Sequence, residues 1–243
     1  VQGSYTFSRQ YSKSLQELHL PLFDLRTTGV PHAFKMIWTY DIPYGRGKRF
    51  GSNISPWLDY LVGGWQFSGS GRVQIQSFVL RDTVLVGMNL DEARQALKNV
   101  RFVIDPITGV TTVWNFPQDI IDNTRKAFNT DETQPTFYAP GTEPTGRYFA
   151  PAGGPACNFL YPGDCGTKEL WFLGRWFGEF DFRLAKGVPV GGARIEVSAE
   201  MFNAMMAKNF PVSLSPSNSA NVFRITSTQS GARTAQIVFR VSW

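Results

Sequence analysis

The feature that most constrains the fold is a two-residue alternation at the end of the chain. Every second position there is apolar, namely Ala235, Ile237, Phe239, Val241 and Trp243, and the positions between are polar apart from Val238. Successive side chains of a strand point to opposite faces, so this pattern predicts a β-strand with one apolar and one polar face. The same alternation recurs at residues 1–8, 34–42, 65–76, 178–184 and 194–201, which predicts about six strands.

Alternation alone does not separate a soluble sheet with one wet face from a membrane barrel with a polar lumen. Strand length favours the barrel, because several segments keep the pattern for ten residues or more, whereas soluble strands average about 5 to 6. Tyr and Trp residues lie near the segment ends, as interfacial girdles require. We therefore predict an all-β fold, a transmembrane antiparallel β-barrel in the bacterial outer membrane. A soluble carbohydrate-binding β-sandwich is the alternative.

The connection lengths give a second test of the barrel, because outer-membrane barrels alternate tight inner turns with long outer loops. Counting back from Trp243, we expect outer connections at residues 203–233, 79–169 and 13–31. Inner connections are expected at residues 187–192 and 44–64. The second inner connection is too long for a tight turn, and a short amphipathic turn is expected within it at residues 56–61.

The segment 79–169 is far longer than an ordinary loop, so we expect an extracellular insertion with structure of its own. Asn89, with Glu92 three residues later, predicts a capped helix at residues 90–98, and a second helix is expected at 117–128. Residues 101–104 and 110–114 are expected to pair as a hairpin. Cys157 and Cys165 lie in the Pro/Gly-rich remainder, where we favour a disulfide over two free thiols.

About six strands are too few to close a barrel, since the smallest closed barrels use eight. Unpaired strand edges cannot face lipid, because each unsatisfied backbone group there costs several kcal/mol. The sequence also opens inside a predicted strand at Val1. We expect the partner strands to lie in preceding sequence or in another chain, and we favour preceding sequence.

Several sequence stretches resemble TonB-dependent receptors. They are His32-Ala33-Phe34-Lys35-Met36, the run from Ile42 to Gly51, the run from Gly63 to Gly69, the run from Pro144 to Pro151, and Glu200-Met201-Phe202-Asn203-Ala204 with Asn209-Phe210. The residues of these stretches and their order along the chain resemble the Oar-like, carboxypeptidase-regulatory-like-domain-containing group of acidobacterial type. The resemblance covers most of the chain.

The resemblance implies a 22-stranded, plugged transport barrel, of which residues 1–243 would supply about the last six strands. It implies energy supply by a TonB-ExbB-ExbD complex acting through an N-terminal part with plug and TonB box, neither of which this sequence contains. The nutrient would be a chelated metal, a glycan or a peptide. The resemblance also implies that the barrel-assembly machinery reads a C-terminal signal, here Phe239, Val241 and Trp243.

Charged residues occupy the polar rows of the predicted strands, and we expect them to face the lumen: Arg72, Glu179, Asp181, Arg183, Arg194, Glu196, Glu200 and Arg240. The carboxylates among them could suggest catalysis. Their spacing on adjacent strands instead favours cross-strand ion pairs or a solvated wall, and contact with substrate or plug is the alternative. Loop aromatics are candidate substrate contacts, or else the loop's own small core: Trp114, Tyr138, Tyr148 and Phe149.

Other function classes have little support in the sequence. Lys and Arg are spread along the chain and the net charge is only +5, so we expect no nucleic-acid partner. Two histidines without ligand spacing indicate neither a metal site nor a hydrolytic triad, and we expect no enzyme activity and no cofactor. The basic run around Lys48 and Arg49 is expected at an inner turn near anionic lipid, with lipopolysaccharide as a further membrane partner. A structural or adhesive barrel whose surface loops bind a partner is the alternative to transport.

Overall fold

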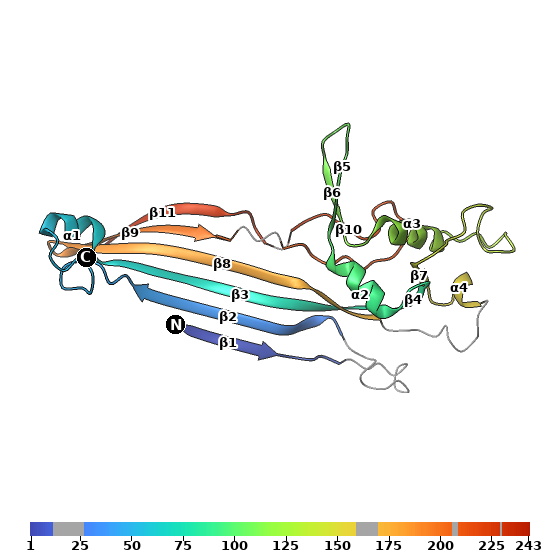
Figure 1. Ribbon diagram of the computed structural model, residues 1–243, viewed down its shortest axis with the longest axis horizontal. Helices are drawn as coiled ribbons and strands as arrows, with labels where there is room; N and C mark the ends of the chain where they lie inside the picture. The colour runs from blue at the N-terminus through green and yellow to red at the C-terminus, as the bar shows by residue number, and fades with distance from the viewer. Residues whose placement is uncertain (12–26, 159–169, 206–208, 229) are drawn as a thin grey trace.

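A computed structural model describes residues 1–11, 27–158, 170–205, 209–228 and 230–243. Its main feature is one antiparallel sheet of six strands in the order β1 (Gln2–Phe7), β2 (Gly29–Asp41), β3 (Trp65–Leu80), β8 (Leu170–Val190), β9 (Ala193–Phe202) and β11 (Thr234–Ser242). Each strand pairs with the previous and the next sheet strand along the chain (Figure 1). The six predicted strands are confirmed, and the fold is mostly β.

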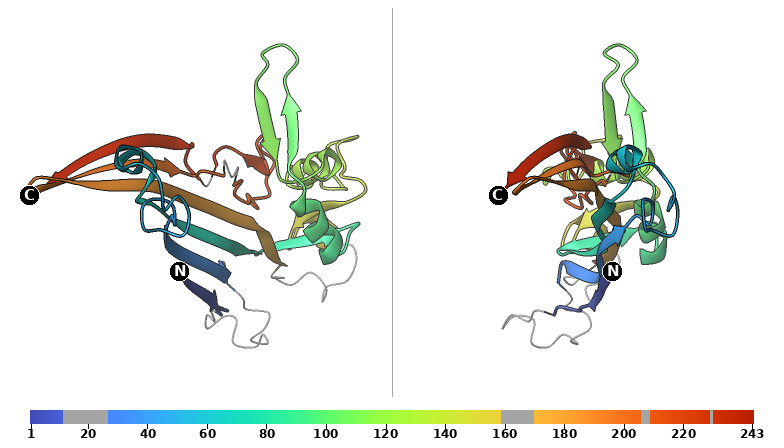
Figure 2. Two further views of the ribbon diagram at one scale, coloured as in Figure 1. Left: turned by 60° about the vertical axis from the view of Figure 1, so that its left-hand side comes forward. Right: turned by 90° about the vertical axis from the view of Figure 1, so that its left-hand side faces the viewer.

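The sheet is open, because β1 and β11 each pair on one side only among the described residues. The expected closed barrel and its total number of strands therefore remain predictions. Figure 2 shows the sheet as a curved, twisted band with β1 and β11 at its two edges.

Strand β8 differs from the sequence prediction at both ends. It begins at Leu170, eight residues before the predicted start at residue 178. Residues 170–177 do not alternate cleanly, because a register irregularity opposite Ile75 and Ser77 interrupts the two-residue period there. At the other end the predicted turn at residues 187–192 is wrong, since pairing continues to Val190 opposite Ala193. Only Gly191 and Gly192 connect the strands, and the left-handed φ of 60° at Gly191 suits such a turn.

The connections divide by length between the two ends of the sheet. One end holds the turn between β8 and β9, the C-terminus and residues 42–64 with helix α1 (Pro56–Val62), which confirms the expected helical turn (Figure 1). The other end holds the connections between β1 and β2, β3 and β8, and β9 and β11. We call these the inner and the outer end. No helix among the described residues is long and apolar enough to cross a membrane.

A small folded unit, here called the loop domain (residues 81–158 and 209–228), occupies the outer end. Its elements are β4 (Thr83–Val86), α2 (Leu90–Lys98), β5 (Arg101–Ile104), β6 (Thr111–Trp114), α3 (Gln118–Ala127), β7 (Tyr148–Pro151), α4 (Pro155–Asn158) and β10 (Arg224–Ile225). Strands β10, β6 and β5 form one sheet, and β4 pairs with β7. The two predicted helices and the hairpin are confirmed. The predicted capping box is present, with Asn89 and Glu92 bonding each other's backbone at 2.9 Å.

The main buried core lies in the loop domain and at its junction with β8. Phe116, Phe149, Phe172 and Phe223 are almost completely buried. Their rings pack edge-on or tilted, with the Phe116 and Phe223 centroids 4.7 Å apart. Such aromatic packing stabilises a fold beyond its buried area. The loop domain therefore has a core of its own.

Candidate functional site

The charged residues predicted to share one face of the sheet do share it. Arg72 lies opposite Glu179, Arg183 opposite Glu200, and Arg240 opposite Glu196. Because residues two apart along a strand point the same way, the register places all eight on one side. We call this side the charged face: Arg72, Glu179, Asp181, Arg183, Arg194, Glu196, Glu200 and Arg240.

Arg183 organises the centre of the charged face. Its Nη2 donates to Glu196 Oε1 at 2.6 Å, and its Nε donates to Glu200 Oε1 at 3.0 Å. Gln236 on β11 donates to the second oxygen of Glu200 at 2.8 Å, so the network crosses three strands. The predicted cross-strand ion pairs are therefore present, and these two carboxylates neutralise a guanidinium.

Asp181 and Arg72 lie on the same face, and their partners are hydrogen-bonding groups without charge. The Asp181 carboxylate accepts from the Asn203 backbone amide at 2.9 Å and lies 3.4 Å from the Ser70 hydroxyl. Arg72 donates from Nε to Gln74 at 2.7 Å. Among the described residues, no group of three or more His, Cys, Asp or Glu side chains could hold a metal ion. The face presents fixed, partly exposed charges to solvent.

Toward the outer end, this side of the sheet changes from charged to apolar. Phe78 and Leu80 continue the row of Arg72 and Gln74 on β3, and they pair with Phe172 and Leu170 of β8. All four pack into the core of the loop domain. The loop domain therefore folds over the same side of the sheet that carries the charges.

The four candidate aromatics all lie in this domain. Phe149 is fully buried between α3 and the core, while Tyr148 and Tyr138 are less than a tenth exposed. Trp114 is half-buried against the core. Burial raises the pKa of both Tyr138 and Tyr148 above the usual tyrosine value. This placement favours the alternative that they form the loop's own core, and ligand contact stays a prediction.

Two arginines that the sequence reading missed fasten the loop domain to β8. Arg175 donates to the carbonyl oxygen of Leu97 at 2.6 Å and to Asn115 Oδ1 at 2.5 Å. Arg94 of α2 donates to the carbonyl oxygen of Trp171 at 2.9 Å. In the sequence, Arg175 is marked only as a single basic residue inside an otherwise apolar, aromatic run.

The family comparison agrees with this geometry. The model of the family described as outer membrane beta barrel domain matches residues 1–236, nearly the whole chain. The chain belongs to this family. A search of the curated proteins and a search of the solved structures each found no match. This outer membrane β-barrel domain is located in the bacterial outer membrane.

The side opposite the charges, here called the apolar face, is the second functional surface of this outer membrane β-barrel domain. On β11 it presents Ile237, Phe239 and Val241, whose exposed fractions are 69%, 72% and 54%. Trp243 is 97% exposed. Helix α1 lies over the inner end of this face. A barrel wall in lipid has such an uncovered apolar surface, whereas a soluble sandwich would bury it.

Two belts of rings mark the apolar face. Trp38, Phe67 and Phe182 cluster toward the inner end, with centroids 5.6 to 6.2 Å apart. Toward the outer end, the Tyr5 hydroxyl and His32 Nδ1 are hydrogen-bonded at 2.7 Å. Tyr40 of β2 lies opposite Phe67 of the inner belt. It is eight residue steps from His32, or about 26 Å along the strand. At the strand tilt of roughly 35 to 45° in outer-membrane barrels, this separation spans about 20 Å across the membrane, which fits within the apolar band of roughly 25 Å.

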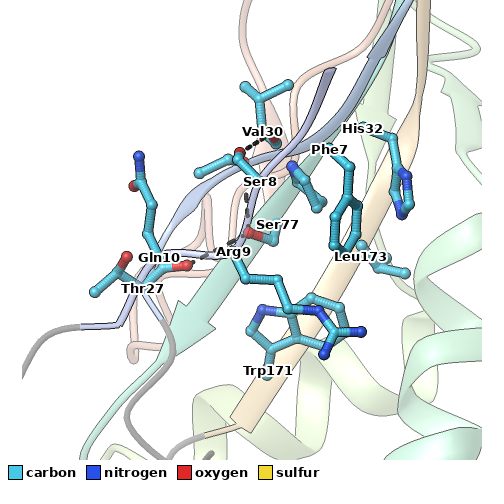
Figure 3. A pocket seen from close by; sticks show the side chains of 12 residues that line it. Phe7, Ser8, Arg9, Gln10, Thr27, Val30, His32, Ser77, Trp171 and Leu173 are labelled. Atoms are coloured by element: carbon cyan, nitrogen blue, oxygen red, sulfur yellow. Dashed lines mark hydrogen bonds between the residues drawn. The ribbon is translucent and has the colours of Figure 1, made fainter. Parts of the chain in front are cut away.

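A cavity of about 240 Å³ lies at the outer end of the apolar face (Figure 3). Phe7, His32, Trp171 and Leu173 form part of its wall. The Arg9 guanidinium stacks over Phe7 at 5.3 Å, and the Ser8 hydroxyl donates to the carbonyl oxygen of Val30 at 2.8 Å. This lining suits an apolar group with an anionic end. Phe7, His32, Trp171 and Leu173 lie on the apolar face, which separates the cavity from the charged face.

The predicted disulfide lies outside what the structure describes. Cys165 and the Cys157 side chain lie outside the described part of the chain. The pairing of the two cysteines stays a prediction.

Proposed function

We propose that this domain is part of the wall of a TonB-dependent transporter that moves a nutrient across the outer membrane. The nutrient would be a chelated metal, a glycan or a peptide. In this proposal the charged face lines the lumen and the apolar face meets lipid. The observation that carries it is the separation of a polar and an apolar face across the six strands, with Ile37, Lys186 and Val238 as exceptions.

The ion pairs of Arg183 support a water-filled interior. A charge is expensive against lipid, but a paired and partly solvated one is tolerated inside a barrel. The position of the loop domain also fits transport, because it covers the outer end of the charged face. Placed above a closed lumen, it would narrow the mouth through which a substrate enters.

The remaining parts of the proposal follow the resemblance to TonB-dependent receptors. The open edges of β1 and β11 would pair with further strands of the barrel. The TonB-ExbB-ExbD complex would act through a plug outside this chain. The barrel-assembly machinery would bind the C-terminal strand with Phe239, Val241 and Trp243. No enzymatic step, cofactor or metal is part of the proposal.

Growth of a deletion strain tests this function. The deletion strain and a tonB mutant would be grown on a panel of chelated metals, glycans and peptides as limiting nutrients. We expect the deletion strain to lose growth on at least one source that the tonB mutant also cannot use, with rescue by the wild-type gene. Normal growth of the deletion strain on every TonB-dependent source would contradict the proposal.

One observation favours a second function, adhesion to a partner at the cell surface. The hairpin of β5 and β6 projects away from the sheet (Figures 1 and 2). It exposes apolar side chains, with Ile104 at 66% and Ile107 at 93%. Deleting residues 102–112 would then abolish adhesion or partner capture by intact cells while leaving nutrient uptake unchanged.

A further inference from the structure

The inner end of the sheet carries a second exposed surface, formed by residues 44–62. Helix α1 buries none of its side chains. Trp57, Tyr60 and Leu61 are each more than 60% exposed, and Phe50 of the preceding loop is 55% exposed. Exposed aromatic and aliphatic residues on so short a segment indicate contact with another apolar phase.

Hydrogen bonds hold α1 against the apolar face of the sheet. Lys186 occupies an apolar-face position, in register with Trp65 and Val197. Its ammonium donates to the carbonyl oxygens of Gly63 and, at 3.1 Å, Asp59, at the end of α1. The Trp65 indole donates to the carbonyl oxygen of Leu61 at 2.9 Å. A cation is favoured at a helix C-terminus, which explains a lysine in this apolar row.

The loop that precedes α1 is basic. Arg46, Lys48 and Arg49 are exposed and form no ion pair among the described residues. The one acidic residue of the connection 42–64 is Asp59, whose carboxylate accepts from the Arg46 backbone amide at 2.8 Å. The surface therefore combines positive charge with apolar side chains.

We propose that residues 44–62 form an anchor that binds anionic phospholipid in the inner leaflet of the outer membrane. The short turn between β8 and β9 marks the same end of the sheet as the inner one. Trp57, Tyr60 and Leu61 enter the boundary between headgroups and acyl chains. Arg46, Lys48 and Arg49 bind the phosphate groups, as basic interfacial segments do.

Lipid retention by the folded full-length protein tests the anchor. The protein in detergent micelles would be titrated with phosphatidylglycerol or with phosphatidylcholine, and bound lipids counted by native mass spectrometry. We expect several-fold greater retention of phosphatidylglycerol by the wild type. The triple variant Arg46→Gln, Lys48→Gln, Arg49→Gln should lose this preference.

A matched triple variant controls for total charge. Lys98→Gln, Lys126→Gln and Arg233→Gln remove the same charge at the outer end and should leave the preference intact. Trp57→Ser with Leu61→Ser should reduce retention of both lipids. A salt titration of the wild-type protein does not depend on the folding of any variant. High salt should abolish the preference for phosphatidylglycerol, because salt screens exposed charges.

Equal retention of both lipids by the wild type, or an unchanged preference in the inner triple variant, would overturn the proposal. Lipid retention is measured without a transport assay, so its result is separate from the test of the transport function.

Discussion

Arg183 Nη2 lies 2.6 Å from Glu196 Oε1 across the β8 and β9 pairing, and the same guanidinium bonds Glu200. One arginine is therefore shared by two carboxylates on the charged face, and it neutralises one of their two negative charges. The three side chains are between a fifth and a third exposed, so water screens the pairs only in part. Removing the arginine leaves both glutamates without their shared cation.

Arg183→Leu should accordingly lower the free energy of unfolding by about 1 to 2 kcal/mol, from two cross-strand pairs of up to about 1 kcal/mol each. Urea unfolding of the folded protein in bicelles measures this value. Arg240→Leu is the control, because Arg240 is exposed and forms no ion pair among the described residues. Equal effects of the two substitutions would show that the network does not stabilise the sheet.

Sequence periodicity predicted the sheet well where each face keeps one character. The rows of β9 and β11 alternate with Val238 as the one exception, and the pairing places the residues on the faces that this pattern predicts. The outer half of β8 was missed because its charged-face side turns apolar to contact the loop domain, and the register irregularity near Ile75 interrupts the period. Local patterns carry no information about such a change of environment.

The loop domain shows the same limit. The Asn89 and Glu92 capping box is a local signal, and it predicted α2 correctly. The core contact between Phe116 and Phe223 joins segments far apart in the chain. No short-range pattern marks that contact, so the sequence left open whether the loop aromatics bind substrate or pack together.

Arg175 should stabilise the attachment of the loop domain to β8. It donates to Leu97 and Asn115 from a partly buried position. Arg175→Met keeps much of the volume but loses these charge-assisted bonds, which are worth about 1.5 to 3 kcal/mol each before any repacking. Hydrogen exchange should rise across α2 and β6 and stay slow in β9 and β11. Arg125→Met, on an exposed i,i+3 pair of 4.0 Å, should change nothing measurable, and equal exchange in both variants would contradict this role.

Acid should loosen the loop domain at α3. The hydrogen bond from Arg147, at 2.6 Å, lowers the pKa of Asp119 below its usual value. A lowered carboxyl pKa contributes stability above the unfolded-state value of about 3.9, and this contribution disappears as the pH falls through the lower folded value. Because both side chains are more than 40% exposed, the effect should stay below about 1 kcal/mol.

Limited proteolysis of the loop domain between neutral pH and about pH 3 measures this dependence. Asp119→Asn should reduce protection at neutral pH and flatten its change with pH. Glu132→Gln is the control, an exposed carboxylate for which the described residues include no ion-pair partner. An unchanged pH profile in Asp119→Asn would exclude the pair as its source.

Gly69 should tolerate no side chain. A Cβ there would lie 2.4 Å from both the Asp181 carbonyl oxygen and the Trp38 ring, whereas at Gly178 the nearest atom would be 4.0 Å away. Gly69→Ala should cost about 1 to 3 kcal/mol through overpacking, and Gly178→Ala on the same face should cost much less. The heat-induced gel-mobility shift of the folded protein compares the two variants, and equal midpoints would contradict the close approach of Trp38.

In the membrane, the apolar face should meet lipid and the charged face should meet water. Spin labels at Ile237 and Phe239, and at Gln236 and Arg240, test it in the full-length protein in bilayers, with collision rates measured for oxygen and for a water-soluble nickel chelate. Accessibility should alternate along β11, with oxygen favoured at positions 237 and 239 and the nickel chelate favoured at 236 and 240. Equal accessibility at all four positions, or the reverse alternation, would contradict it.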